Sequence, residues 1–207
     1  VLTLVVNHFK SKGSCPDDGV NAAQDDGQSC WNAERTQAAE DQLAWLAGQP
    51  TGVADEDVLV LGDLNAYALE DPVRAFQDQG FVDLLTRFQG DQAYSYIFDG
   101  ETGHLDHALA SPSLDARVVD AGAWHINADE PRALDYNQDF KSDPQIDEFF
   151  AADAYRSSDH DPLHVDLNLT ADDGEAAPPA DDDSGGGGGL GWLWLALVLA
   201  AGRRRRA

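Results

Sequence analysis

The chain has 207 residues, of which 43% are hydrophobic, and it carries a formal net charge of −25 at pH 7. This length and hydrophobic content suffice for one domain with a substantial core. The acidic surface repels polyanions and argues against a classical basic nucleic-acid-binding module. Salt shortens that repulsion to roughly 8 Å, and divalent cations can supply local positive charge, so the charge does not exclude nucleic acid.

Residues 1–169 have the apolar patterns of a folded domain. The chain starts at Val1, inside the first predicted strand, so we expect it to be part of a longer protein. A helix is predicted at Ala33–Leu46, capped by Asn32, and a shorter one from Asp71-Pro72 to a stop at Gly80. Strands with interspersed helices predict an α/β or α+β layered sandwich. The predicted strands are Val1–Val6, Val58–Leu61, Tyr94–Phe98, His104–Ala110, Arg117–Ile126 and Leu163–Leu169.

Cys15 and Cys30 lie in a polar loop rich in glycine and aspartate. An even pair of cysteines in such a loop predicts a local disulfide formed in an oxidising compartment, and two free thiols are the alternative. Aspartates of the same loop could bind Ca²⁺, although a solvated acidic loop is the commoner case. These aspartates are Asp17, Asp18, Asp25 and Asp26.

The composition changes sharply after Leu169. Residues 170–189 are rich in Asp, Ala, Pro and Gly and are predicted to be a disordered linker. Residues 190–207 combine a short apolar run with four terminal arginines, which predicts a short transmembrane segment with a cytoplasmic basic end. The glycine run, apolar segment and basic end together resemble a bacterial GlyGly-type sorting signal, and an ordinary C-terminal anchor is the alternative. The resemblance implies export, transient retention in the inner membrane and release by a rhomboid-type protease.

The strongest local signal is an apolar strand that runs into Gly62-Asp63-Leu64-Asn65. Side chains alternate along extended backbone, so Asp63 and Asn65 are expected to point the same way. A carboxylate and an amide carbonyl suit a hard cation such as Mg²⁺ or Mn²⁺. A strand-ending Asx turn is the alternative interpretation.

Three further motifs contain histidine, and in two of them a carboxylate is the neighbouring residue. Asp159 and His160 lie in Ser157-Ser-Asp-His-Asp-Pro162, where they could bind metal and phosphate. Asp106 lies in an apolar strand and needs a partner, for which a protonated histidine is suited. Its neighbour His107 is expected to face the other way and to be structural. His8 ends the first strand, where a structural role is the commoner one.

Taken in chain order, the four motifs resemble the endonuclease/exonuclease/phosphatase superfamily over residues 1–169. The resemblance implies the C-terminal half of a four-layer αββα, DNase I-like sandwich with the active site at one edge of its paired sheets. Within the superfamily the chain is most similar to secreted bacterial extracellular nucleases. The features behind this narrower resemblance are Asn7–Ser14, the loop ending in Cys30-Trp31-Asn32, Tyr94-Ser95-Tyr96 and Trp124–Pro131.

This resemblance implies a Mg²⁺- or Mn²⁺-dependent phosphodiesterase, and most specifically a monomeric, secreted nuclease acting on DNA, with RNA as an alternative substrate. It implies that Asp63 orients or deprotonates the attacking water and that Asp63, Asn65 and Asp159 bind the metal. The remaining implied catalytic residues are His160, paired with Asp106, and His8, which would face the phosphate. Candidate substrate-binding residues are Lys10, Lys12 and Tyr96.

The superfamily also has a metal-binding glutamate and an acidic residue that orients the histidine matching His8, both in the half of the fold that would precede Val1. We therefore expect this chain alone to bind metal poorly, to be nearly inactive and to expose apolar surface on one sheet. Two other functions stay open. One is a sphingomyelinase-like or small-phosphoester hydrolase of the same fold, and the other is a non-catalytic acidic module that binds Ca²⁺ or partners.

Overall fold

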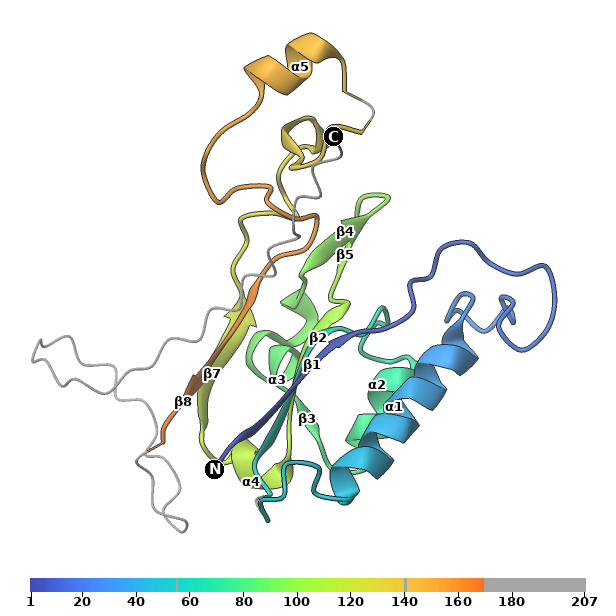
Figure 1. Cartoon of the computed structure of the whole chain (residues 1–207), viewed down its shortest axis with the longest axis vertical. Coiled ribbons are helices and arrows are strands. Elements are labelled where there is room, and N and C mark those ends of the chain that lie inside the picture. The colour runs from blue at the N-terminus through green and yellow to red at the C-terminus, as the bar shows by residue number, and fades with distance from the viewer. Residues whose placement is uncertain (55, 140, 170–207) are drawn as a thin grey trace, which may run out of the picture.

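The computed structural model describes residues 1–54, 56–139 and 141–169. A four-stranded sheet forms its centre, with the strand order β1-β2-β6-β3 (Figure 1). The parallel pair β1 (Thr3–His8) and β2 (Val58–Asp63) lies beside β6 (Asp106–Ala110) and the short β3 (Val82–Asp83). Strand β6 is antiparallel to both of its neighbours.

Helices α1 (Asn32–Ala47) and α2 (Asp71–Gln77) cover one face of this sheet (Figure 1). Strand alternation sends one set of apolar side chains to this face, where they pack against the two helices. Phe76 is completely buried here and meets Phe81 edge to face. The buried members of this core are Val5, Ala39, Val60, Leu64, Ala66, Val73, Phe76 and Leu109.

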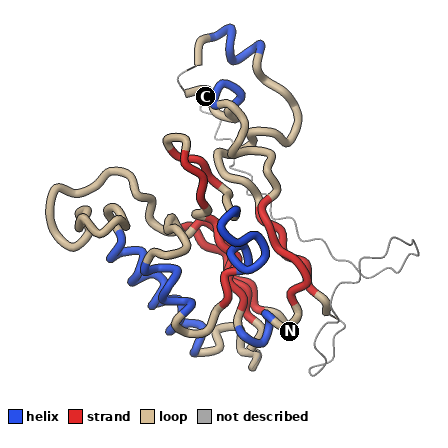
Figure 2. Tube along the Cα trace, turned by 180° about the vertical axis from the view of Figure 1, so that it is seen from behind, coloured by secondary structure: helices blue, strands red, loops and turns tan. Residues whose placement is uncertain are grey.

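The opposite face packs against α3 (Leu84–Gln89), α4 (Pro112–Asp115) and a separate two-stranded sheet of β7 (Val118–Ala123) and β8 (Leu163–Leu167). Seen from behind, α3 lies between the central sheet and this pair (Figure 2). The second core consists of Leu59, Leu84, Leu85, Ala108, Ala110, Leu114, Val118 and Ala121. A helical layer followed by two sheets confirms the predicted α/β sandwich class.

Two smaller parts lie at the end of the sheet where β1 and β2 finish (Figure 1). One is the hairpin of β4 (Tyr96–Phe98) and β5 (Glu101–Gly103), and the other is the excursion between β7 and β8, which contains α5 (Asp143–Glu148). Two short 3-10 helices are η1 (Gly90–Gln92) and η2 (Arg132–Leu134). On the edge strand β1, Leu4 and Val6 are exposed, in line with the expected apolar surface.

Several predicted boundaries were wrong. Asn32 is the first residue of α1 and not its cap, because its amide donates to the Asp71 carboxylate while Trp31 takes the left-handed position before the helix. The second helix, α2, begins at Asp71 as predicted, directly after Glu70. Strand β7 ends at Ala123 and not at Ile126, because the following backbone turns around Asp161.

The predicted strand His104–Ala110 is also shorter, since β6 begins at Asp106. The predicted linker at 170–189 and the predicted membrane segment at 190–207 lie outside the described residues. Within the ranges given above, no helix has both the length and the apolar character that crossing a bilayer requires.

Candidate active site

Strand register brings three predicted site residues into one row across the sheet. His8 is paired with Asp63 between β1 and β2, and Asp63 is paired with Asp106 between β2 and β6. Because β6 runs antiparallel to β2, its first residue pairs with the last residue of β2, which in turn pairs with the last residue of β1. The Nε2 atom of His8 lies 3.5 Å from Oδ2 of Asp63, and the His8 side chain is 75% exposed. The row therefore lies at an accessible edge of the sheet.

Gly62 permits the close approach of the two parallel strands just before this row. Its φ is +118°, and a Cβ atom there would lie 2.2 Å from the carbonyl oxygen of Asn7. Any other residue would push β1 away from β2 or change the local backbone. The glycine thus contributes directly to the spacing between His8 and Asp63.

His160 reaches the row from the loop before β8 and pairs with Asp106. Its Nδ1 atom lies 2.6 Å from Oδ2 of Asp106, and the same oxygen accepts a hydrogen bond of 2.7 Å from the hydroxyl of Ser95. The backbone NH of Asp161 donates to the Ser95 carbonyl, which ties the His160 loop to the segment before β4. Two short contacts therefore fix the orientation of the Asp106 carboxylate, and through it the His160 ring.

The surrounding charges favour a cationic His160. Burial opposes protonation, but the hydrogen bond and charge of Asp106, with the charges of Asp63 and Asp159, outweigh it and raise the pKa of His160 to about 9. Burial, followed by the charge of Asp106, also raises the pKa of Asp63, while His160 opposes this rise. This edge of the sheet thus holds a protonated His160 next to Asp63, whose carboxylate is more basic than that of an exposed aspartate.

Asp63 and Asn65 come together through a turn and not through continued extended backbone. Strand β2 ends at Asp63, and Asn65 has a left-handed φ of 49°. The Asp63 carboxylate accepts hydrogen bonds from the Asn65 backbone NH at 2.7 Å and from its side-chain amide at 2.9 Å. The Asx-turn interpretation is therefore confirmed, and the expected strand alternation at Asn65 was wrong, although the two side chains still meet.

Tyr96 covers one side of the His160 ring. The two ring centroids are 4.5 Å apart and the planes are inclined by 28°. Because a tyrosine ring attracts a cation through its face, this contact suits a protonated imidazole. Tyr96 therefore contacts a proposed phosphate-facing group directly and is not simply a core residue.

Potential metal-ligating atoms gather in two places within the described ranges. One group is Asp63, Asp106 and His160, and the other is the buried group of Asp83, His104 and His107. The aspartates of the disulfide loop, proposed above for Ca²⁺, belong to neither group. In the first group, Asp106 and His160 are already joined by a hydrogen bond.

Oxygen donors beside this first group fit a hard divalent cation. The side-chain NH₂ of Asn65 donates to the carbonyl of Phe9 and to Asp63, which leaves its side-chain oxygen available as a ligand. Asp159 precedes His160 and acts electrostatically on His160 and Tyr96. Asp63 and Asn65, which bond each other, would supply the carboxylate and amide oxygens that Mg²⁺ and Mn²⁺ prefer, whereas Asp159, the third predicted ligand, belongs to neither group.

The family model of the Endonuclease/Exonuclease/phosphatase family matches residues 3–160. The chain belongs to this family. Among solved structures, an AP endonuclease from Archaeoglobus fulgidus is similar, with 19% sequence identity, a TM-score of 0.48, and coverage of 80% of this chain and 61% of that chain. This chain spans about three fifths of that structure's length. No curated protein matches the chain.

The two lysines suggested for substrate binding in this family member have different surroundings. Lys12 is half-buried, its Nζ lies 2.5 Å from the Glu70 carboxylate, and burial lowers its pKa. It joins the disulfide loop to α2 and is poorly placed to contact a substrate. Lys10 lies over the Trp31 ring, with its Nζ 4.4 Å from the ring centroid, and remains closer to solvent than Lys12.

The predicted Cys15–Cys30 disulfide is present.

Asp161 supports the loop that carries His160, a role that was not predicted from the sequence. One of its buried carboxylate oxygens accepts hydrogen bonds from the backbone NH groups of Ile126, Asn127 and Ala128, and the other bonds His125 at 2.8 Å. The Asn127 amide donates to the His160 carbonyl at 2.7 Å. This network accounts physically for the Trp124–Pro131 stretch, which appeared in the sequence only as a family-like feature.

Proposed function

We propose that this chain carries part of the catalytic centre of a divalent-metal-dependent phosphodiesterase, and that the substrate of the complete enzyme is nucleic acid, with DNA preferred to RNA. The observation that carries the proposal is the 2.6 Å contact between His160 and Asp106 beside the basic carboxylate of Asp63. Phosphoryl transfer needs a positioned water and fixed positive charge near the phosphorus more than it needs a covalent intermediate. Family membership supports the same class of chemistry.

In the proposed reaction, Asp63 orients a water molecule and accepts its proton as the water oxygen attacks phosphorus. A new P–O bond forms while the bond to the leaving oxygen breaks, and the leaving oxygen takes a proton from solvent. His160 faces the non-bridging oxygens as an imidazolium and stabilises their developing charge, and His8 contacts them from the other side of Asp63. A cation held by Asp63, Asn65 and Asp159 would supply Lewis-acid stabilisation of the phosphoryl group.

Several local features offset the repulsion between a strongly acidic chain and a polyanion. His160, whose pKa is raised, supplies positive charge at the edge where the phosphate would bind. A divalent cation would add to this charge. Tyr96, which already stacks on His160, provides an aromatic face close to the same edge. The proposed substrate is therefore recognised at one narrow edge and not over a broad basic surface.

We also propose that the protein is exported and acts outside the cytoplasm. The Cys15–Cys30 disulfide supports an oxidising compartment. The GlyGly-like arrangement after residue 184 supports transient retention in the inner membrane before release by a rhomboid-type protease. Comparing the mass of the protein from culture medium with that of the membrane-bound form tests this: release with loss of residues 190–207 is expected, and an intact cytoplasmic protein would contradict it.

The substrate test uses the full gene product, incubated with plasmid DNA, RNA or sphingomyelin in Mg²⁺ or in EDTA. We expect Mg²⁺-dependent loss of DNA that stops in EDTA and in an Asp63→Ala variant. Cleavage of sphingomyelin with intact nucleic acid would replace the nuclease by a lipid phosphodiesterase. Absence of turnover with every substrate would favour a binding module.

A further inference from the structure

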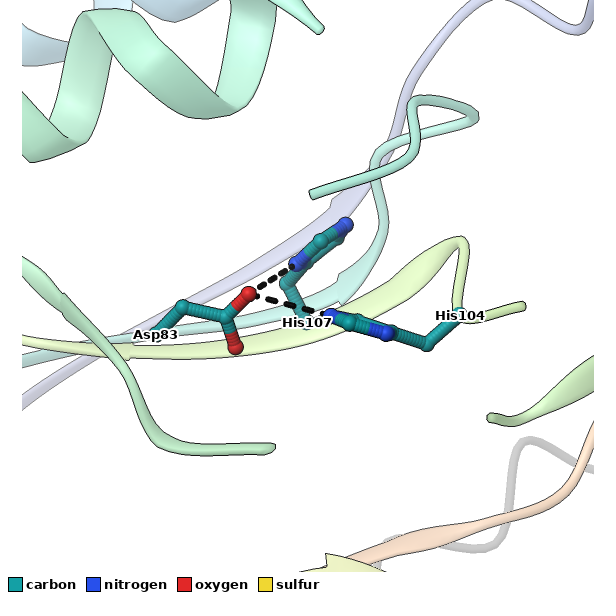
Figure 3. A group of neighbouring side chains, drawn as sticks. All are labelled: Asp83, His104 and His107. Carbon is teal, nitrogen blue, oxygen red and sulfur yellow. Dashed lines mark hydrogen bonds and ion pairs between the residues drawn. The ribbon is translucent and has the colours of Figure 1, made fainter. Parts of the chain in front are cut away.

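A second histidine–carboxylate cluster is formed by Asp83 of β3, His107 of β6 and His104, which lies just before β6 (Figure 3). Asp83, His104 and His107 are all buried, and the His107 side chain is fully enclosed. The Oδ2 atom of Asp83 lies 3.0 Å from Nε2 of His104 and 3.3 Å from Nδ1 of His107. The proposed reaction uses none of these residues, so their burial needs another explanation.

His107 connects this cluster to the turn that carries Asn65. Its second ring nitrogen, Nε2, lies 2.8 Å from the carbonyl oxygen of Ala66, the residue that follows Asn65. Both ring nitrogens thus face oxygen acceptors, and a neutral imidazole could donate to only one of them. A doubly protonated ring satisfies both contacts, and the anionic Asp83 next to it offsets the buried charge.

The backbone around Ala66 needs such an anchor. Asn65 occupies the left-handed region, which costs energy for a residue with a side chain unless the surroundings fix it. On the N-terminal side, the Leu64 NH donates to the Leu105 carbonyl and the Asn65 NH donates to Asp63. On the C-terminal side, the hydrogen bond from His107 to Ala66 holds the carbonyl end of the same turn.

We propose that His107 and Asp83 are positioning residues, which hold the Ala66 carbonyl and thereby fix the Asn65 turn in the geometry needed at the active-site edge. This inference rests on the proposed function for its catalytic consequence, but not for its structural one. A metal ion is the competing occupant of the cluster. Hydrogen bonding fits better, because Oδ2 of Asp83 also accepts from the Thr86 hydroxyl at 3.0 Å and so has three donors around it.

A matched pair of substitutions separates the two contacts of His107. In His107→Gln the amide nitrogen can replace Nε2 and donate to Ala66, whereas in His107→Asn it can replace only Nδ1, which faces Asp83. His104→Ala is the control, since it removes a different contact of Asp83 and leaves the Ala66 contact intact. Asp83→Asn serves as a second variant if His107→Asn does not fold, because it keeps the shape of the side chain and weakens the anchor.

Hydrogen–deuterium exchange of residues 64–69 in the full gene product is the first measurement, with residues 58–61 as the internal reference. We expect His107→Asn, and to a smaller extent Asp83→Asn, to speed exchange of residues 64–69 about tenfold relative to the reference, as loss of one buried hydrogen bond predicts. Exchange in His107→Gln and His104→Ala should match that of the unsubstituted protein. Equal exchange in His107→Asn and His107→Gln would overturn the inference.

Activity and metal content complete the test. With DNA in Mg²⁺, we expect kcat of His107→Asn to fall about a hundredfold while KM changes by no more than about twofold, because the turn is displaced and not the binding surface. If the unsubstituted protein turns over no substrate, the proposed function fails while the exchange result still decides the inference. The metal content of both proteins is also measured. If the unsubstituted protein contained one equivalent of zinc and Asp83→Asn contained none, the hydrogen-bonded arrangement would be contradicted.

Discussion

The Nδ1 atom of His160 lies 2.6 Å from Oδ2 of Asp106, although the two residues are 54 positions apart in the chain. Asp106 begins a central strand, whereas His160 ends a long excursion between β7 and β8. The contact forms because Asp161 and Asn127 fix the segment that leads from the excursion back to β8. Ser95 in turn orients the Asp106 carboxylate. It keeps a histidine charged at neutral pH next to Asp63.

Replacing Asp106 by Asn is expected to lower the pKa of His160 from about 9 toward its ordinary value of 6.5, because the hydrogen bond to a carboxylate and its charge are both lost. Titration of the His160 ring by NMR in metal-free buffer measures this directly. A Ser95→Ala variant is the milder control, since it removes one hydrogen-bond donor to Asp106 without removing the charge of the carboxylate. An unchanged pKa in Asp106→Asn would show that the pair is not ionic.

The raised pKa of His160 also fixes the direction in which the stability of the protein changes with pH. Since the pKa of His160 in the folded state is above its ordinary value of 6.5, protonation of His160 favours folding. Its contribution to the free energy of unfolding is complete below about pH 6.5 and is lost as the pH rises through about 9. Urea midpoints should therefore fall over this range more steeply in the unsubstituted protein than in Asp106→Asn. Parallel curves for the two proteins would contradict the assignment.

Tyr96→Ala is expected to lower kcat about tenfold, because a face of His160 then opens to water and loses its aromatic contact. Tyr96→Phe keeps the ring and should stay within about twofold of the unsubstituted rate if the hydroxyl has no part in the reaction. Steady-state rates on DNA for both variants check this. An equal loss in both would assign the role to the hydroxyl instead of the ring face.

Asp161→Asn should destabilise the protein by about 2 kcal/mol, because a charged acceptor of three backbone NH groups is replaced by a neutral amide. Asp147→Asn, on the exposed surface of α5, is the matched control and should be nearly neutral. Urea denaturation of both variants at neutral pH measures the difference. Similar stabilities for the two would mean that the loop is held by other contacts.

Removing the disulfide with a Cys15→Ser and Cys30→Ser double variant is expected to cost about 3 kcal/mol, the amount associated with a loop of this length. The activity per folded molecule should change little, because the loop's main contacts run to α2 through Lys12 and Glu70. Denaturation of the protein with and without a reducing agent gives the same comparison without substitution. A stability unaffected by reduction would contradict the prediction.

Much of the site could be predicted from the sequence because its residues follow apolar strands whose ends meet. The row His8–Asp63–Asp106 comes from strand register, which the apolar runs indicate. Two kinds of contact could not be predicted. The role of Asp161 depends on backbone NH groups from a distant loop, and that of Lys12 depends on Glu70, 58 positions away. Neither contact leaves a periodic or spaced pattern in the chain.

The helix starts were less predictable for a related reason. Asn32 and Asp71 each have the residue type of a helix cap, but the side chains bond to each other across the gap between α1 and α2. A long-range hydrogen bond thus replaced the local one that the sequence indicates. The Asn65 turn is the opposite case, because a local Asx bond ends the extended backbone at Asp63, where the strand alternation was expected to continue to Asn65.

The most direct test of the central claim is the rate at which the full gene product cleaves a fluorescent DNA oligonucleotide in Mg²⁺, compared with an Asp63→Asn variant of similar stability. We predict that the unsubstituted protein hydrolyses the phosphodiester bonds and that the variant is slower by about a thousandfold, because the group that orients and deprotonates water is lost. Equal rates in the two proteins would show that the His8–Asp63–Asp106–His160 edge is not where the reaction takes place.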